Sequence, residues 1–305
     1  VLAILFAVMC IGGSFGGGNM FQANQSYAQV ADVLPFFAGG WGSLAYGLLL
    51  AFLVGVVIIG GIRRIGQVAG FIVPVMCGIY LVAGLFIIFT HLDQVAPALG
   101  KIVGEAFTPK AGLGGALGVL ITGFRRAAFS NEAGVGSASI AHSAAATDEP
   151  VREGIVALLE PFIDTIVVCT FTGVAIIASG VWSSGETGAG LTQMAFDSGM
   201  SGGLGSKVIA LSLALFAFST IIGWSYYGDR ATVYLFGPRL VLPYKVVFCI
   251  AHFLGAIFSL EIVWNFGDSA LGLMSLPNLI ALVLLNRKVR QMTREYFSRE
   301  HVPYR

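Results

Sequence analysis

Long apolar runs recur along this chain, and they limit what it can fold into more than any other feature does. Of the 305 residues, 56% are hydrophobic and only 11% are charged, whereas about 25% of the residues in a soluble domain are charged. A helix needs about 20 predominantly apolar residues to cross the hydrocarbon core of a bilayer. The sequence therefore predicts an all-α integral membrane protein that crosses the membrane several times.

About eight runs are long and apolar enough to predict transmembrane helices. They cover residues 1–30, 42–61, 65–90, 112–129, 154–181, 206–227, 242–260 and 270–285. The chain becomes polar and basic from Asn286 onward. We therefore expect a transmembrane domain over residues 1–285, followed by a short basic tail over residues 286–305.

The placement of basic residues predicts the orientation, because Lys and Arg accumulate in cytoplasmic loops. If the first span runs from inside to outside, only Lys101, Lys110 and Lys207 fall outside. The basic residues on the cytoplasmic side are then Arg63, Arg64, Arg152, Arg230, Arg239, Lys245, Arg287, Lys288, Arg290, Arg294, Arg299 and Arg305. This bias predicts a cytoplasmic C-terminus.

Residues 123–145 lie between apolar runs but contain groups that a membrane interior rarely holds. These groups are Arg125, Arg126, Asn131 and Glu132. Charges at membrane depth are costly and usually face a cavity, a partner or a transported ligand. Because Gly134 and Gly136 follow them, we expect the helix to break and to leave backbone groups free for a ligand, as in transporters. The alternative is an ordinary helix end that leads into a cytoplasmic loop.

The two arginines need counter-charges, and the candidates are Glu132, Glu160 and Asp164. Glu160 and Asp164 are four residues apart, which places them on one helix face. They belong either to a structural ion network or to a site that couples transport to a proton or cation. We assign Asp268 to an outer loop, and we interpret His142 as a contact between helices rather than a ligand.

Two further segments carry candidate binding residues. Gly17 and Gln22 either mark a close helix crossing or contact a zwitterion, because an amide can both donate and accept hydrogen bonds. Ser219 and Thr220 offer oxygen ligands that suit Na⁺, although either hydroxyl could bond its own helix. Trp224 either lines a pocket or belongs to the interfacial aromatic belt. Because Thr220 and Trp224 share a helix face, we favour the pocket.

Several function classes are not supported by the sequence. It contains no phosphate-binding G-x-x-x-x-G-K-[ST] motif and no H-E-x-x-H motif, which are typical of ATP-driven pumps and zinc peptidases. Its four cysteines stand singly inside apolar runs, which is typical of apolar packing rather than of metal binding. We therefore expect neither an enzyme nor a resident cofactor.

Five segments together resemble one family of transporters. The sequence is similar to the alanine/glycine:sodium symporters, also called the alanine or glycine:cation symporter family, over essentially its whole length. The segments are GGGNMFQAN (16–24), GGIRRIGQVAGFIVPVM (60–76), FSNEAGVGSASIAHSAA (129–145), EPFIDTIVVCT (160–170) and FSTIIGWSYYG (218–228).

The resemblance implies a five-plus-five inverted-repeat fold like that of the neurotransmitter:sodium symporters. It implies Na⁺-coupled uptake of alanine, glycine and similar small amino acids by alternating access, in the plasma membrane of a bacterium or archaeon. Matched by motif, Ser219 and Thr220 correspond to Na⁺ ligands. The implied substrate contacts are Gly17, Gln22, Phe129, Thr220 and Trp224.

The resemblance also implies that this chain begins at the third core helix, so that its spans are helices three to ten and the first two are missing. The family's first helix supplies much of the substrate-carboxylate and Na⁺ sites, so we expect an N-terminally truncated fragment that does not transport alone. Arg126 stands where the family pattern has a glycine. A passive channel or facilitator, or a non-transporting receptor, remains the alternative function.

Overall fold

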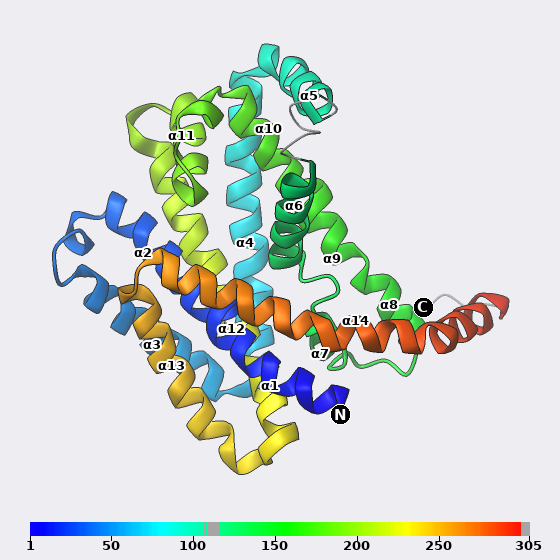
Figure 1. The fold of residues 1–305 in the computed structure, drawn as a ribbon. Helices are drawn as coiled ribbons and strands as arrows, with labels where there is room; N and C mark the ends of the chain where they lie inside the picture. Colours follow the sequence, from blue (N-terminus) through cyan, green and yellow to red (C-terminus); the bar gives the residue numbers. More distant parts are fainter. Residues whose placement is uncertain (107, 109–115, 300–305) are drawn as a thin grey trace.

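The computed structural model describes residues 1–106, 108 and 116–299, and the regular elements in these ranges are all helical (Figure 1). The α-helices are α1 Leu2–Phe15, α2 Phe21–Val33, α3 Gly42–Ile59, α4 Gly61–Thr90, α5 Leu92–Ala106, α6 Ala116–Asn131, α7 Ser137–His142, α8 Pro150–Ala157, α9 Leu159–Pro161, α10 Thr170–Ala178, α11 Gly188–Gly199, α12 Leu204–Phe236, α13 Val241–Ile257 and α14 Leu260–Ser298. Two π-helical segments, Gly16–Met20 and Phe162–Cys169, join α1 to α2 and α9 to α10.

Within the described residues, seven helical stretches are long and apolar enough to cross a membrane. This confirms the prediction of an all-helical multi-pass membrane protein. The predicted count of about eight is not confirmed. The fourth predicted span, 112–129, coincides with α6, which has 16 residues, fewer than the roughly 20 that a full crossing requires. Its first residues, 112–115, lie outside the described part of the chain.

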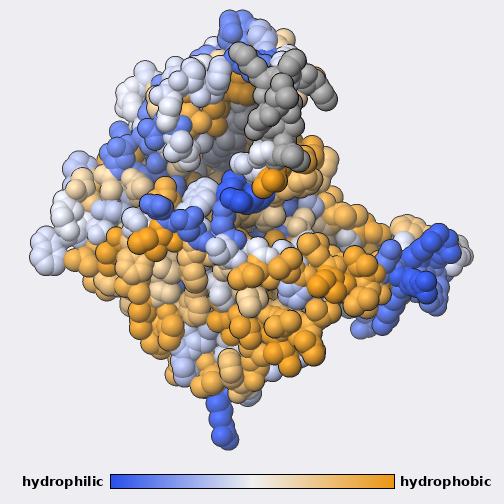
Figure 2. Space-filling view, viewed as in Figure 1, coloured by the Kyte–Doolittle hydropathy of each residue, from blue (hydrophilic) through white to orange (hydrophobic). Residues whose placement is uncertain are grey.

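Helix α12 lies at the centre of the molecule and packs against α1, α2, α4 and α11, while α13 lies beside α3 (Figure 1). One buried cluster joins α3, α12 and α13 through Ile58, Ile221 and Phe248, which are fully buried. Large apolar side chains such as Phe52, Phe71 and others on the outer helix faces are exposed. Figure 2 shows a broad hydrophobic surface over α13 and α14, as expected of a protein that faces lipid.

The start of the π-helical segment crosses α14 at a point where both carry glycine. A Cβ atom at Gly16 would lie 2.9 Å from the Cα atom of Gly267, and one at Gly267 would lie 3.2 Å from the backbone nitrogen of Gly17. Small residues allow helix backbones to approach closely in membranes. The crossing holds the π-helical segment Gly16–Met20 against α14 and fixes one wall of the cavity described below.

The predicted helix break is present. Helix α6 ends at Asn131, and three residues with positive φ follow: Glu132 (56°), Gly134 (81°) and Gly136 (106°). L-residues rarely adopt this conformation, which glycine tolerates. The Nδ2 group of Asn278 donates to the carbonyl of Gly134 at 2.9 Å, so α14 holds the break from the side.

Helix α14 extends into the first part of the predicted basic tail. Helix α14 begins at Leu260, ten residues before the predicted span, and continues through the polar residues after Asn286 to Ser298. Figure 2 shows this end of α14 as a hydrophilic extension of an apolar helix. Arg299 forms an ion pair with Glu149, which tethers the end of the described chain to the start of α8.

Candidate functional site

All five residues predicted to contact substrate line one cavity of about 300 Å³. Helices α2, α6, α12 and α14, the first π-helical segment and the break supply its walls. The predicted residues are Gly17, Gln22, Phe129, Thr220 and Trp224. The other lining residues are Arg126, Ser130, Glu132, Trp264 and Leu271. Segments separated by more than 250 residues therefore meet around one polar space.

Gly17 of the π-helical segment and Gln22 in the first turn of α2 lie on the cavity wall. The Nε2 group of Gln22 donates to the carbonyl of Gly17, five residues earlier, at 3.2 Å. A Cβ atom at Gly17 would lie 2.8 Å from Cδ1 of Leu271. Gly17 therefore allows a close helix contact and lines the cavity, while its contact with a substrate stays a prediction. Single-turn π-helical bulges are frequent at functional sites.

Trp224 is a buried cavity wall. Its side chain is 3% exposed, and its Nε1 group donates to Oε1 of Glu132 at 2.7 Å. A Cβ atom at Gly18 would collide with the indole ring, so the glycine leaves the space that the ring occupies. The structure therefore places Trp224 on the wall of the cavity, and its contact with a substrate stays a prediction.

Glu132 joins the break to the cavity. One carboxylate oxygen accepts a hydrogen bond from Trp224, and the other accepts one from the hydroxyl of Ser137 at the start of α7. Among the residues that the structure describes, no Lys or Arg pairs with this carboxylate. A non-glycine residue at a φ of 56° is under local strain, which is common at functional sites.

The predicted counter-charges of the two arginines were wrong. Arg126 Nη2 lies 2.5 Å from Oδ2 of Asp268, and Arg125 Nη1 lies 3.8 Å from the same oxygen. Asp268 is not in an outer loop, because α14 begins at Leu260 and contains it. Its side chain is 15% exposed. The polar residues around Asp268 interrupted the apolar run and obscured the start of the helix.

Aromatic rings surround the Arg126–Asp268 pair. The guanidinium carbon of Arg126 lies 4.3 Å from the centre of the Trp264 ring, and the ring of Phe129 is nearly parallel to that of Trp264 at 6.2 Å. The ring of Phe21 packs edge-on against both. This group ties α6 to α14 beside the cavity. Trp264 was missed by the sequence analysis, although it is four residues from Asp268 and shares its helix face.

The two predicted Na⁺ ligands face different surroundings. Thr220 lines the cavity. The hydroxyl of Ser219 donates to the carbonyl of Phe216 at 2.9 Å and lies 3.6 Å from Sδ of Met76 on α4. Consecutive side chains on an α-helix point about 100° apart, which explains the separation. The Na⁺ role of the pair stays a prediction.

Comparison with known proteins identifies the family. The profile described as "Sodium:alanine symporter family" matches residues 1–303. The chain belongs to the sodium:alanine symporter family. It is 41% identical to the sodium/alanine symporter AgcS of Methanococcus maripaludis over 97% of its length. It is 39% identical to an uncharacterized transporter of Haemophilus influenzae over 98%, and 36% identical to the probable sodium/glutamine symporter GlnT of Bacillus subtilis over 97%.

Membership of the sodium:alanine symporter family confirms that the resemblance was correct. The family consists of transporters rather than enzymes, in agreement with the expectation from the sequence. The chain spans 65% of the length of the AgcS and Haemophilus influenzae relatives and 61% of GlnT.

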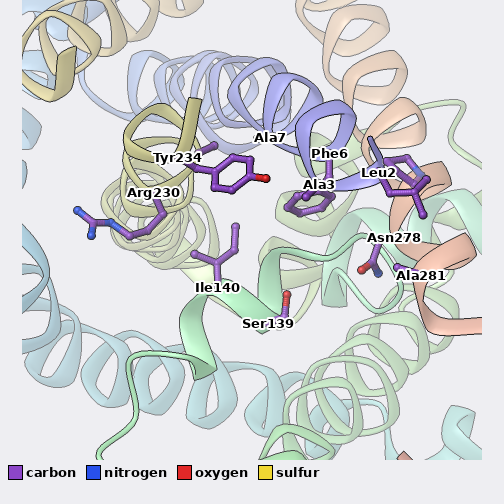
Figure 3. A pocket seen from close by; sticks show the side chains of 12 residues that line it. Leu2, Ala3, Phe6, Ala7, Ser139, Ile140, Arg230, Tyr234, Asn278 and Ala281 are labelled. Carbon is purple, nitrogen blue, oxygen red and sulfur yellow. The ribbon is translucent and has the colours of Figure 1, made fainter. Parts of the chain in front are cut away.

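A larger cavity of about 450 Å³ lies between the start of α1, helix α7, the end of α12 and α14 (Figure 3). In Figure 3 the rings of Phe6 and Tyr234 border it, while the guanidinium group of Arg230 points away. Phe6 and Asn278 also lie against Gly136. Because its lining is mainly apolar and contains none of the predicted residues, we assign this cavity to the surroundings of the break rather than to the substrate.

Proposed function

We propose that the complete protein carrying this chain is a secondary active symporter that couples Na⁺ influx to uptake of small amino acids such as alanine and glycine. One observation carries the proposal. The five residues that the family motifs indicate converge on one cavity that also contains a carboxylate, a guanidinium group and an amide. Substrate sites of such transporters lie where a helix is broken near the bilayer midplane.

The polar groups of the cavity match both ends of an amino acid. Glu132 has no basic partner within the described residues, so its carboxylate is suited to receive the substrate's ammonium group. Arg126, with five N–H donors, and Gln22, with an amide donor, are suited to the substrate's carboxylate. A cavity lined by both a carboxylate and a guanidinium group favours a zwitterion over a singly charged molecule.

The cavity is also small. Its volume of about 300 Å³ is at the lower limit of the roughly 300–1,000 Å³ that is typical of small-molecule sites. The rigid rings of Trp224 and Phe129 leave little space for a long side chain. The names of the relatives include both alanine and glutamine, so we propose that these wall residues determine which side chains are accepted.

We further propose the five-plus-five inverted-repeat architecture, with the described spans as core helices three to ten. On this assignment the α6–α7 break is the interruption of the sixth core helix and α12 is the eighth. Alternating access then moves the broken helix relative to α12 and α14, and the aromatic group around Arg126 closes one side of the cavity. Ser219 and Thr220 are proposed Na⁺ contacts.

The test is uptake of labelled alanine by the complete protein in liposomes. An inward Na⁺ gradient should drive accumulation above equilibrium, and replacement of Na⁺ by choline should abolish it. Uptake that only equilibrates, with or without Na⁺, would contradict symport and identify a facilitator. Binding of alanine without any uptake would identify a receptor.

We also propose a cytoplasmic C-terminus in the plasma membrane, from the distribution of basic residues. A cysteine introduced by Arg299→Cys should react with a membrane-impermeant maleimide only after the cells are permeabilised. A cysteine introduced by Lys207→Cys, on the other predicted side, is the matched control and should react in intact cells. Labelling of the Arg299→Cys variant in intact cells would show that the C-terminus lies outside and would contradict the proposed orientation.

A further inference from the structure

One face of helix α14 carries a continuous row of exposed side chains that changes from apolar to basic along the helix. In chain order the row consists of Leu276, Ile280, Val283, Arg287, Arg290 and Arg294. Successive members are four or three residues apart, which keeps their side chains on one face of a helix. We propose that the three arginines of this row bind the headgroups of anionic phospholipids. This surface is separate from the substrate cavity and goes beyond the proposed function.

The apolar half of the row faces the hydrocarbon of the bilayer. Leu276, Ile280 and Val283 are 57%, 51% and 76% exposed. They belong to one of the helical stretches that are apolar enough to cross a membrane, and apolar side chains are stabilised where water is absent. Because the row stays on one face of α14, the arginines that follow Val283 point toward lipid as well.

The opposite face of α14 packs against the protein. Met274 is buried on this face, and Met292 and Tyr296 further along it are only partly exposed. Just after the helix, Arg299 pairs with Glu149 at the start of α8. These contacts fix the rotation of α14 about its axis, so the three arginines of the row are turned away from the protein and are exposed.

The three arginines have no counter-charge in the part of the chain that the structure describes. None of them forms an ion pair or a hydrogen bond with another described residue. The carboxylates nearby have other partners. Glu295 accepts a hydrogen bond from Gln291 at 2.8 Å, and Glu149 is the partner of Arg299. Because like charges three or four residues apart destabilise a helix, an anion bound along the row would stabilise this end of α14.

The arginines lie at the depth of the lipid headgroups. The apolar run of α14 ends at Leu285, and a rise of about 1.5 Å per residue places Arg287 and Arg290 about 3 and 8 Å beyond it along the helix axis. The headgroup layer extends about 5–7 Å on each side of the hydrocarbon core. Side chains on a helix lean toward its N-terminus, so the side chain of Arg294, one turn further on, points back toward the membrane.

The chemistry of the row favours a lipid over a free anion. A guanidinium group binds a phosphate through two parallel hydrogen bonds, and clusters of basic residues next to a transmembrane helix attract anionic lipids. An anionic phospholipid also has acyl chains, which the apolar half of the same row contacts, whereas inorganic phosphate has none. Phosphatidylcholine carries an ammonium group that compensates its phosphate, so the row should prefer phosphatidylglycerol, which has no such group.

The experiment titrates the purified complete protein in a neutral detergent with phosphatidylglycerol or phosphatidylcholine and counts the bound lipids by native mass spectrometry. The wild-type protein should bind phosphatidylglycerol more tightly than phosphatidylcholine. A variant that combines Arg287→Gln, Arg290→Gln and Arg294→Gln should bind phosphatidylglycerol about tenfold or more weakly, because each basic residue near an anionic surface contributes about fivefold to the affinity. Its affinity for phosphatidylcholine should not change.

Matched variants separate the position of a charge from its presence. Arg290→Gln alone should weaken the binding of phosphatidylglycerol about fivefold. Lys288→Gln removes the same charge from another face of the same turn and should weaken it by about twofold or less. A variant that combines Arg287→Lys, Arg290→Lys and Arg294→Lys keeps the charge of the row and should keep most of the preference for phosphatidylglycerol.

A second measurement compares melting temperatures in lipid nanodiscs and does not depend on transport. In phosphatidylcholine alone, the wild-type protein and both triple variants should melt at about the same temperature, because the replaced side chains are exposed. Added phosphatidylglycerol should stabilise the wild-type protein and the lysine variant more than the glutamine variant. Equal stabilisation of all three, or equal affinity of the wild-type protein for both lipids, would overturn the proposal. Equal stabilisation by inorganic phosphate in phosphatidylcholine nanodiscs would assign the row to a soluble anion and would also overturn it.

Discussion

Two helices are interrupted beside the same cavity, and they are interrupted differently. Between α1 and α2 the π-helical segment Gly16–Met20 keeps the helix continuous, so the backbone remains hydrogen-bonded. Between α6 and α7 the chain leaves the helix altogether at positive φ. Gly17 in the first interruption and Gln22 just after it line the cavity, as do Phe129 and Ser130 just before the second interruption and Glu132 within it. The first therefore shapes the cavity, whereas the second supplies its charge and is the better candidate for movement.

The largest expected effect follows from removing the charge at the second interruption. Glu132→Gln keeps an acceptor for Trp224 but cannot pair with an ammonium group. A hydrogen bond to a charged group contributes about 1.5–3 kcal/mol, so alanine affinity should fall by about 10- to 100-fold or more. Equilibrium binding of labelled alanine to the purified complete protein measures this affinity. Glu105→Gln, on the exposed end of α5, is the control. Unchanged affinity would remove Glu132 from the site.

The next prediction compares one glycine from each interruption. Gly136→Ala places a Cβ atom at a φ of 106° and against the ring of Phe6, and a left-handed conformation alone costs an L-residue about 1–2 kcal/mol. Gly17→Ala presses on the movable side chain of Leu271 and meets the ring of Phe129 only at an ordinary contact distance of 3.5 Å. The loss of alanine binding should therefore be larger for Gly136→Ala.

Second-site variants separate the causes of these losses. Leu271→Ala should restore most of the binding lost in Gly17→Ala, because it removes the atom that the new Cβ would contact. Phe6→Ala should restore only part of the binding lost in Gly136→Ala, because the positive φ remains. Complete rescue by Phe6→Ala would mean that the break needs space and not a special backbone conformation.

The sequence could predict the second interruption better than the first. Charged residues next to Gly134 and Gly136 indicated a break, because both the cost of buried charge and the preference of glycine for positive φ are local properties. The π-helical segments carry no such local signal. They depend on contacts with distant helices, such as that of Gly16 with Gly267. The pairing of Arg126 with Asp268, 142 residues away, also depends on how α6 and α14 pack.

The transmembrane helices were predicted well where the apolar runs are continuous. The predicted spans 42–61 and 65–90 agree closely with α3 and α4. They were predicted poorly where a helix contains functional polar groups. Helix α14 carries Asp268 in its first half and a polar extension after Asn286, so only the apolar middle was recognised. Asp268, which obscures the start of this helix in the sequence, is the residue that pairs with Arg126 of the cavity wall.

A smaller loss of alanine transport is expected when Trp224, which contacts both interruptions, is replaced. Trp224 packs over Gly18 and is hydrogen-bonded to Glu132. Trp224→Ala should weaken alanine uptake and admit larger aliphatic amino acids, and discrimination by fit amounts to about 1–3 kcal/mol. The change in selectivity is measured by how strongly unlabelled glycine, valine and leucine inhibit the uptake of labelled alanine. Wild-type selectivity in the variant would show that another residue limits the side chain.

The smallest expected effect is a difference between Ser219 and Thr220 in how their replacement changes the Na⁺ dependence of uptake. Thr220 lines the cavity, whereas the hydroxyl of Ser219 is bonded to its own helix. Thr220→Ala should raise the half-saturating Na⁺ concentration by a few-fold, about the loss of one oxygen ligand, and Ser219→Ala should raise it less. Na⁺ titration of alanine uptake measures both. No change in either variant would refute the Na⁺ role of the pair.

A structure of the complete protein in lipid nanodiscs with alanine and NaCl tests the central claim most directly. We expect alanine in the cavity between the two interruptions, with its ammonium group at Glu132, its carboxylate facing Arg126 and Gln22, and its methyl group against Trp224. Alanine bound elsewhere, for example in the larger cavity beside Phe6 and Tyr234, with the predicted cavity filled only by water, would contradict the account.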